Sequence, residues 1–433
     1  MSSTQQSPNV SSKYWMVAVA VFFLGWVFIY AGRMLVSPVM SEIGKTYGIG
    51  AAAVGGIMSL FYLAYTGLQV PSGIVGDIIG RKRVLVIGFM IYALFVAMVY
   101  FANSYAMFII FWMIAGAAQG SYYGPQYALS SEAIPPKHLA VGSAIIGAGM
   151  SFGIALGYEV SSRSFNAGND WRMAFVYMAI PIFVVALLIL FFIKERVNNV
   201  NTAQTATTEK KKGITLTDFL SLFKRRNLVM AYIAIFCSIY GFFVIITWLP
   251  YYLEMERGMD KAVASRVASI VPWLSIIGTI FFSWVSDRLG KRKAVALFML
   301  PLSLLSIFGI VYSGNLDNST TTSTILGLAT NPQNILLLCV LVLYGFIGKI
   351  SLNPVLLALT AENVPKSLLS TAFGLYNFLG MCGSILAPWM TGFIAEKTGN
   401  LNASFYVAAA VTVIGILALL FVDESKNLNK KTA

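Results

Sequence analysis

Charged side chains are scarce in this sequence: Asp, Glu, Lys and Arg together make up 11% of its 433 residues. A soluble globular domain carries about 25% charged residues, so most of this chain is expected to meet lipid or other apolar helices. Histidine is nearly absent, with His138 alone, and each of the three cysteines lies inside an apolar run. Histidine-based metal sites and catalytic triads are therefore excluded. We expect no metal, no cofactor and no enzymatic activity.

Hydrophobic residues make up 58% of the chain, and its mean hydropathy is +0.76. The formal net charge of +13 does not indicate nucleic-acid binding. The basic residues lie in short loops between apolar runs, where they act as signals for membrane topology. The lipid bilayer is thus the expected surrounding, and no nucleic-acid partner is expected.

Twelve apolar runs are long enough to cross a membrane. A bilayer core of about 30 Å needs roughly 20 apolar residues in a helix, and runs of this length exclude the short strands of a membrane barrel. The sequence therefore predicts an all-α membrane protein with twelve transmembrane helices. The runs lie near 15–40, 50–73, 84–102, 104–129, 139–161, 172–193, 228–253, 263–285, 294–313, 333–359, 369–393 and 403–422.

The basic residues indicate the orientation. With the N-terminus in the cytoplasm, the cytoplasmic segments hold 21 of the 30 Lys and Arg residues and the opposite side holds seven. This bias predicts that both termini are cytoplasmic, in a plasma or inner membrane. The predicted organisation is a tail at 1–14, a six-helix bundle at 15–193, a linker at 194–227, a second bundle at 228–422 and a tail at 423–433.

The two halves repeat each other. Asp77 to Arg83 follows the second run and Asp287 to Lys293 follows the eighth, 210 residues later. The segment Glu132-Ala133-Ile134-Pro135 matches Glu362-Asn363-Val364-Pro365 at a displacement of 230 residues, as Gly153 matches Gly383. Two pseudo-symmetric six-helix bundles derived from one ancestral unit explain this pattern.

The repeated loops each place an aspartate before a glycine turn and a basic run. Gly80 and Gly290 supply the tight turn. An aspartate at a helix C-terminus is disfavoured by the helix dipole, so Asp77 needs a basic side chain or a helix N-terminus as partner. We expect these loops to gate the cytoplasmic side by joining the two halves in one state of the protein. The candidate gating residues are Asp77, Gly80, Arg81, Arg83, Asp287 and Arg288.

The spacing Gly73-x-x-x-Asp77-x-x-Gly80-Arg81-x-Arg83 resembles the signature loop of the major facilitator superfamily. Helix number, repeat and loops extend this resemblance over about 15–422. Within the superfamily, three features resemble the anion:cation symporter branch. They are Tyr65-x-x-x-Gln69-x-Pro71-x-Gly73, Arg33 in Tyr30-Ala31-Gly32-Arg33, and Trp248-Leu249-Pro250-Tyr251. The resemblance implies a secondary transporter that moves small organic anions by alternating access.

The sequence departs from the proton-coupled members of that branch. Those members carry an acidic residue beside the arginine of the first helix and another in the fourth helix, where this chain has Gly32 and Gln119. The pair of membrane-embedded cations without those acids is similar to the oxalate:formate exchangers. Symport with a proton and exchange for a counter-anion both stay open. If protons are carried, Glu159 is the candidate, since we expect no other acid within a helix; Arg163 lies one turn away on the same face.

Two basic residues lie within apolar runs: Arg33 in the first, and Lys349 near the middle of the tenth. A charge at such depth costs about 2.5–3.5 kcal/mol on insertion scales, so each needs compensation. Lys349 also lies 230 residues from Gln119, the displacement of the repeat. We expect Arg33 and Lys349, one from each half, to bind the negative charge of the substrate. The other candidate substrate-binding residues are Tyr30, Gln119, Tyr123 and Tyr127.

The sequence therefore predicts a secondary transporter of small organic anions of the carboxylate or sugar-acid type, acting as a monomer. A drug or sugar carrier of the same superfamily is the first alternative, although Arg33 and Lys349 argue against a neutral cavity. A membrane receptor without transport activity is the second alternative. It would predict large soluble domains or lost gating loops, and neither is seen.

Overall fold

The chain forms a bundle of membrane-spanning helices. The structure is a computed structural model, and it describes residues 14–195, 221–315, 324–365 and 368–423. The tail 1–13, most of the predicted linker 194–227, the Asn318 triplet and the tail from 424 lie outside the described residues. Within the described residues, β1 and β2 form the only sheet, a two-stranded antiparallel pair.

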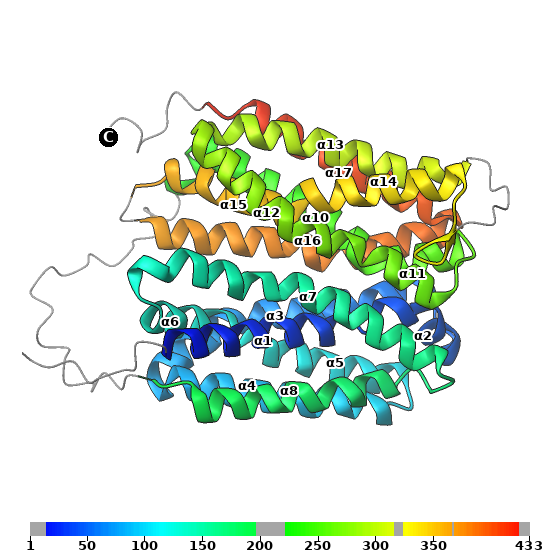
Figure 1. Cartoon of the computed structure of the whole chain (residues 1–433), viewed down its shortest axis with the longest axis horizontal. Helices are drawn as coiled ribbons and strands as arrows, with labels where there is room; N and C mark the ends of the chain where they lie inside the picture. Colours follow the sequence, from blue (N-terminus) through cyan, green and yellow to red (C-terminus); the bar gives the residue numbers. More distant parts are fainter. Residues whose placement is uncertain (1–13, 196–220, 316–323, 366–367, 424–433) are drawn as a thin grey trace, which may run out of the picture.

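The helices fall into two groups, here called the N-terminal half (α1–α8) and the C-terminal half (α10–α17) (Figure 1). The N-terminal half contains α1 (Tyr14–Arg33), η1 (Ser37–Val39), α2 (Met40–Tyr47), α3 (Ala51–Ile79), α4 (Arg81–Met98), η2 (Val99–Phe101), α5 (Tyr105–Gly120), α6 (Tyr123–Ala133), η3 (Pro136–His138), α7 (Leu139–Asn166) and α8 (Met173–Phe192). The C-terminal half contains α10 (Arg226–Met255), α11 (Lys261–Ala268), α12 (Ile270–Leu289), α13 (Arg292–Tyr312), η5 (Ser313–Asn315), β1 (Thr324–Ile325), β2 (Leu328–Ala329), α14 (Pro332–Ile347), α15 (Lys349–Glu362), α16 (Leu369–Thr398) and α17 (Leu401–Leu420).

The structure confirms an all-α membrane fold of two bundles. Eleven stretches of described helix are long and apolar enough to cross a membrane. The predicted fourth run is the one that is not among these eleven spans, since α5 ends at Gly120 and α6 begins at Tyr123. Pro125 contributes to this break because it has no N–H to donate to the Ser121 carbonyl.

The tenth run is also broken, at the equivalent place. α14 ends at Ile347 and α15 begins at Lys349, with Gly348 between them in an extended conformation (φ −66°, ψ −169°). Lys349 thus lies near the middle of the span Pro332–Glu362, as expected, but directly after a one-residue break that the sequence analysis did not predict. The repeat is nevertheless visible here, because Gln119 and Lys349 both lie beside a helix break.

Within each half, glycines let a pair of helices approach closely. A Cβ atom at Gly149 of α7 would lie 2.6 Å from the Phe23 carbonyl oxygen of α1. A Cβ atom at Gly383 of α16 would lie 2.8 Å from the Phe236 carbonyl oxygen of α10. Small residues drive helix association in membranes because lipid tails supply no hydrophobic force between helices. The α1–α7 and α10–α16 contacts are thus equivalent packing units of the two halves.

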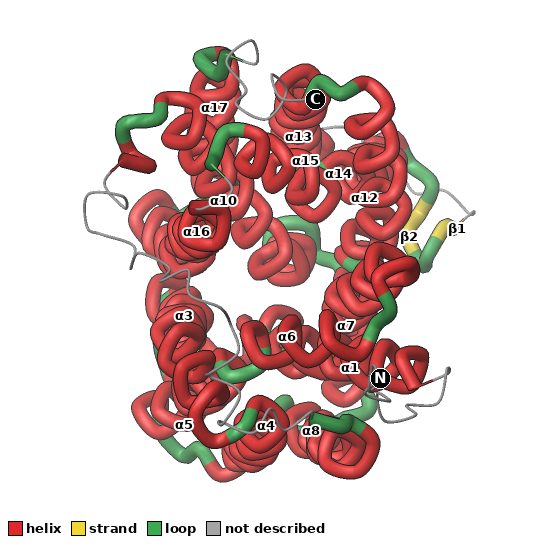
Figure 2. Tube along the Cα trace, turned by 90° about the vertical axis from the view of Figure 1, so that its left-hand side faces the viewer, coloured by secondary structure: helices red, strands yellow, loops and turns green. Residues whose placement is uncertain are grey.

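The two halves meet along α3 and α16 on one side and along α7, α11 and α12 on the other (Figure 2). α1 begins and α17 ends at one end of the bundle, here called the termini end; the opposite end is called the far end (Figure 1). Several hydrogen bonds join described residues of the two halves. The one nearest the termini end joins Gln69, just past the middle of α3, to Asn377, and the others lie between it and the far end. Between described residues, none lies nearer the termini end. In this structure the halves are therefore joined at the far end.

Candidate functional site

Arg33 is the last residue of α1 and its side chain is 1% exposed. The Oε1 atom of Gln119 accepts hydrogen bonds from its Nε at 3.1 Å and its Nη2 at 2.7 Å. Gln119 is itself held in place, because its Nε2 donates to the Ile29 carbonyl at 3.0 Å. The structure thus brings together two of the predicted site residues. The break after Gly120 leaves Gln119 near the end of α5, facing the end of α1.

Aromatic rings surround the rest of the Arg33 guanidinium. Its Cζ lies 4.5 Å from the ring centre of Tyr30, 4.7 Å from Tyr65, 5.2 Å from Tyr62 and 5.5 Å from Phe61. Each ring face attracts a cation, by about 0.5–2 kcal/mol depending on desolvation. Between described residues, Arg33 makes no ion pair. Its charge is therefore compensated by rings and one amide, and no carboxylate in the described part of the chain competes with an incoming anion.

Lys349 lies in the other half as the first residue of α15. Its Nζ lies 5.7 Å from the ring centre of Phe242 on α10, and it makes no ion pair with a described residue. The N-terminus of a helix carries partial positive charge, so a lysine at this position adds to the positive potential. This is an arrangement that attracts anions.

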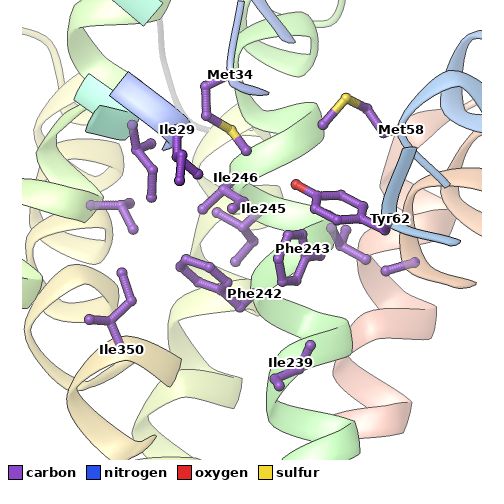
Figure 3. Close-up of a cluster of buried hydrophobic side chains, with 14 of the residues drawn as sticks. Ile29, Met34, Met58, Tyr62, Ile239, Phe242, Phe243, Ile245, Ile246 and Ile350 are labelled. Atoms are coloured by element: carbon purple, nitrogen blue, oxygen red, sulfur yellow. The ribbon is translucent and has the colours of Figure 1, made fainter. Parts of the chain in front are cut away.

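The structure does not bring Arg33 and Lys349 into contact. An apolar cluster formed by both halves, here called the central cluster (Figure 3), contacts each cation: its Tyr62 ring lies 5.2 Å from the Arg33 Cζ and its Phe242 ring lies 5.7 Å from the Lys349 Nζ. The ring centres of Tyr62 and Phe243 are 4.8 Å apart, and those of Phe243 and Phe242 are 5.5 Å apart. The two cations thus lie at opposite ends of this line of rings. The central cluster contains Ile29, Met34, Met58, Tyr62, Ile239, Phe242, Phe243, Ile245, Ile246 and Ile350.

Tyr123 and Tyr127 of α6 lie away from Arg33. Their rings are 5.1 Å apart, and Tyr123 and Tyr127 are 36% and 53% exposed. Trp26 connects them to the arginine, since its ring lies 6.2 Å from Tyr123 and 5.8 Å from Tyr30. Sequence reasoning missed Trp26, although its position one turn before Tyr30 could have indicated it. A path of aromatic side chains thus leads from α6 to Arg33.

A network of charged residues joins the two halves at the far end. Lys261 of α11 is 8% exposed, and its Nζ lies 3.0 Å from Glu42 Oε1 of α2 and also pairs with Glu254 of α10. The Ser41 hydroxyl donates to both carboxylate oxygens of Glu254 at 3.0 Å. These four residues are here called the far-end network. They close this end of the molecule over the central cluster.

The far-end network corrects one sequence-based expectation. Glu159 pairs with Arg163, as the i, i+4 spacing predicts, and its side chain is 29% exposed. It is not the only acid within a helix, because Glu254 lies in α10 with its side chain 16% exposed. The predicted run ended at residue 253, whereas α10 continues to Met255. Glu254 is therefore a second carboxylate that must be considered for proton coupling.

At the termini end, each repeated loop forms an ion cluster within its own half. Arg81 lies 3.0 Å from Asp77 and 2.6 Å from Glu132 of α6, which gives Asp77 the basic partner that it needs. Gly80 has φ +105° and Gly290 has φ +58°, conformations that favour glycine. No ion pair between described residues crosses from one loop to the other half. The loops thus do not join the halves in this structure.

The second loop uses a basic residue other than the one predicted. Arg292 lies 2.7 Å from Asp287 and 3.0 Å from Glu362. Arg288 instead lies over the Trp284 ring at 5.3 Å, and Arg83 donates to the Ile79 carbonyl at 3.4 Å. The candidate gating residues predicted from the sequence therefore did not include three partners of the loops, namely Arg292, Glu132 and Glu362. Glu132 and Glu362 could have been found from their equivalent places in the repeat.

The protein has two helical bundles that meet around a central cluster. Each half contributes one cation, and charge networks lie at both ends. This arrangement defines a membrane carrier that works by relative movement of its halves. The sequence profile described as Major Facilitator Superfamily matches residues 22–380 and 267–433. The chain belongs to the major facilitator superfamily.

Similar proteins cover nearly the whole chain. The hexuronate transporter of Bacillus subtilis (strain 168) is 25% identical over 416 residues, which cover 94% of each chain. The cis,cis-muconate transport protein of Acinetobacter baylyi is 25% identical over 441 residues, 98% of each chain. Among solved structures, a D-xylose-proton symporter superposes with a TM-score of 0.74 at 17% identity, covering 96% of this chain and 99% of that one. This structural likeness supports the fold.

Proposed function

We propose that this protein is a secondary transporter of small organic anions of the carboxylate or sugar-acid type. The observation that carries the proposal is Arg33, a buried cation that makes no ion pair with a described residue. The hexuronate and muconate transporters, whose substrates are carboxylates by name, are similar over more than nine-tenths of the chain and support the same class.

The substrate would bind between Arg33 and Lys349. The planar fork of an arginine matches a carboxylate with two parallel hydrogen bonds. Lysine offers a compact point charge that suits a second carboxylate. Because the central cluster separates the two cations here, the substrate must displace part of it. Tyr30, Tyr62 and Gln119, which already contact Arg33 or its neighbours, would then line the site, and Tyr123 and Tyr127 would line the path from the termini end.

Transport would follow from closure of the two halves around the anion. In the empty protein, rings and an amide are the only compensation that described residues give the two cations, and a bound anion improves it. Return of the empty protein is thereby disfavoured, so we propose exchange for a counter-anion as the mode of coupling. The alternative is proton symport through Glu159 or Glu254. Counterflow without a pH gradient would favour exchange; uptake that requires an imposed proton gradient would favour symport.

The orientation with both termini in the cytoplasm, in a plasma or inner membrane, belongs to this proposal. The basic loops at the termini end support it, because such loops are retained on the cytoplasmic side. In this orientation, no hydrogen bond or ion pair between described residues joins the two halves at the cytoplasmic end. We propose that the protein works as a monomer, since each half supplies one of the two cations.

A ligand screen with flux measurements tests the function. Purified protein is heated with monocarboxylates, dicarboxylates and sugar acids, and with neutral sugars as controls. A ligand that binds only the folded state raises the melting temperature by mass action. The hits are then tested for uptake by proteoliposomes. Stabilisation and uptake by neutral sugars alone would favour the sugar-carrier alternative. Binding without flux would favour a receptor.

We further propose that the loop clusters become contacts between the halves when the far end opens. Asp77→Asn removes one carboxylate that holds Arg81 while Glu132 remains. We expect this variant to fold normally and to exchange anions several-fold more slowly. Lys137→Gln, an exposed change on the same end, is the control. Wild-type exchange rates in the well-folded Asp77 variant would leave the loop with a role in topology only.

A further inference from the structure

A groove on the outer surface of the C-terminal half is not used by the proposed transport mechanism. It has a volume of about 510 Å³ and lies between α10, α16 and α17. α16 and α17 lie along one outer edge of the C-terminal half (Figure 2). Its lining consists of Phe223, Val229, Tyr232, Ile233, Phe236, Cys237, Leu379, Cys382, Val411 and Ile414.

The lining offers almost no polar group to a ligand. Among the described residues that line the groove, Tyr232 has the only hydroxyl, and it donates to the Ala372 carbonyl at 3.2 Å. The groove lies in the half of the membrane nearest the termini end, because α10 begins there and contributes residues from its first turns. A groove in this position cannot stay empty without losing dispersion contacts along its walls. The occupant must therefore be apolar over most of its length, as an acyl chain is.

Three basic residues follow directly after one lining residue of the groove. Phe223 lines the groove, and Lys224, Arg225 and Arg226 follow it directly. Lys224 and Arg226 are exposed, and Arg225 is partly exposed. None of the three makes an ion pair with a described carboxylate. The Arg226 guanidinium lies 5.3 Å from the ring of Phe421 at the end of α17, which places a cation between the two helices that frame the mouth.

We propose that this groove binds an anionic phospholipid, with one acyl chain between α10, α16 and α17 and the phosphate group against Lys224 and Arg225. An apolar slot with basic groups at the level of the headgroups matches both parts of such a molecule. Phosphate oxygens accept charge-assisted hydrogen bonds from arginine and lysine. A zwitterionic lipid would gain less, because its own cationic group competes for the same phosphate and adds repulsion.

The groove lies next to the interface between the two halves. Its walls include α10 and α16, and α16 contacts α3 of the other half. A chain lodged between α10, α16 and α17 thus lies behind a helix of the interface between the halves. Its occupancy is expected to affect the stability of the C-terminal half rather than the substrate site, so its test does not depend on the proposed substrate.

Native mass spectrometry of the full chain, released from nanodiscs of defined composition, tests the proposal. The probes are phosphatidylglycerol and phosphatidylcholine of equal chain length. We expect one phosphatidylglycerol to remain bound, and retention to fall at least tenfold in two variants. Val411→Phe fills the groove without changing charge, and Lys224→Gln/Arg225→Gln removes the headgroup contacts. Lys137→Gln/Lys291→Gln, which removes two exposed charges elsewhere, is expected to retain the lipid.

Thermal stability provides the second readout. Phosphatidylglycerol is expected to raise the melting temperature of the wild type and of the control, and not that of the two groove variants. Equal retention of both lipids would show that the basic mouth does not select the headgroup. Full retention in a folded Val411→Phe variant would show that the groove is not the site. Binding that appears only after residues 424–433 are removed, or a dimer that excludes lipid, would show that another occupant covers the groove. Each of these results would overturn the proposal.

Discussion

Arg33 keeps its charge inside the protein through one amide and four aromatic rings. Lysine at this position would preserve the positive charge but would lose the planar guanidinium that can donate two parallel hydrogen bonds to a carboxylate. We expect Arg33→Lys to weaken anion binding by about 10- to 100-fold, the equivalent of one charge-assisted hydrogen bond of about 1.5–3 kcal/mol. Isothermal titration calorimetry with the best ligand of the screen measures the change. Arg163→Lys, on an exposed side chain, is the matched control, and unchanged affinity in Arg33→Lys would return Arg33 to a structural role.

Lys349 supplies a point charge rather than a fork, so its effect should depend on the charge of the ligand. We expect Lys349→Gln to weaken dianion binding about tenfold more than monoanion binding, since only a dianion has a second carboxylate to meet it. The ratio of the two dissociation constants is the measurement, and Lys397→Gln at the far end is the control. An equal loss of affinity for dianions and monoanions would mean that Lys349 acts through the general electrostatic potential of the site or through folding.

Several residues of the site could be predicted from the sequence because their chemistry is unusual for their place. A charge within an apolar run needs compensation, and this indicated Arg33 and Lys349 without any contact being known. The far-end network could not be predicted, since Glu42 and Lys261 are 219 residues apart and both look like ordinary loop charges. Arg292 was missed for a related reason. The turn at Gly290 sets which basic side chain faces Asp287, and the basic run itself does not show this.

At the scale of the helices, run length and hydropathy predicted nearly every element, because a span needs only length and apolar composition. The two helix breaks were missed, since the backbone turns at Ser121 and at Gly348 within stretches that length and hydropathy predict as single helices. Such a break depends on how neighbouring helices pack and on where proline removes a donor. The aromatic path from α6 to Arg33 depends on the first break.

Helix approach provides a test at the same scale. Gly383→Ala places a Cβ atom 2.8 Å from the Phe236 carbonyl oxygen, so α16 must move away from α10. We expect a loss of about 1–3 kcal/mol, as in other overpacked sites. The control is Gly374→Ala on the same helix, where nothing lies within 4 Å of the added atom. That variant is expected to be neutral or slightly stabilising, because alanine is the better helix former. The melting temperatures of the two variants in the same detergent measure both effects. Equal shifts in the two variants would contradict the close contact at Gly383.

At the scale of the whole molecule, the far-end network is the feature that distinguishes this state of the carrier. Lys261 lies between Glu42 and Glu254, and it is the only cation among the described residues that pairs with carboxylates on both halves. Removing its charge leaves two partly buried carboxylates near each other, one from each half. Glu42 would keep its pair with Lys45 and Glu254 would keep the Ser41 hydroxyl, but the two carboxylates would no longer share a cation and would repel each other across the interface. The two halves should therefore separate at this end.

We expect Lys261→Gln to shift the population toward a far-end-open state. A change of about 1.4 kcal/mol in the balance of two states alters their ratio tenfold, which pulsed dipolar spectroscopy resolves. Spin labels at Phe101→Cys and Tyr312→Cys, in a background where the three native cysteines are serine, report the distance between the halves at the far end; both positions are exposed and lie outside the far-end network. Glu254→Gln in addition to Lys261→Gln removes one of the repelling charges, so this double variant should recover much of the short distance. Arg163→Gln changes a far-end charge that pairs only within its own half, and it should leave the distances as in the wild type. If Lys261→Gln keeps the wild-type distances while remaining folded, apolar packing of the central cluster holds the halves together, and the network only seals the end above it.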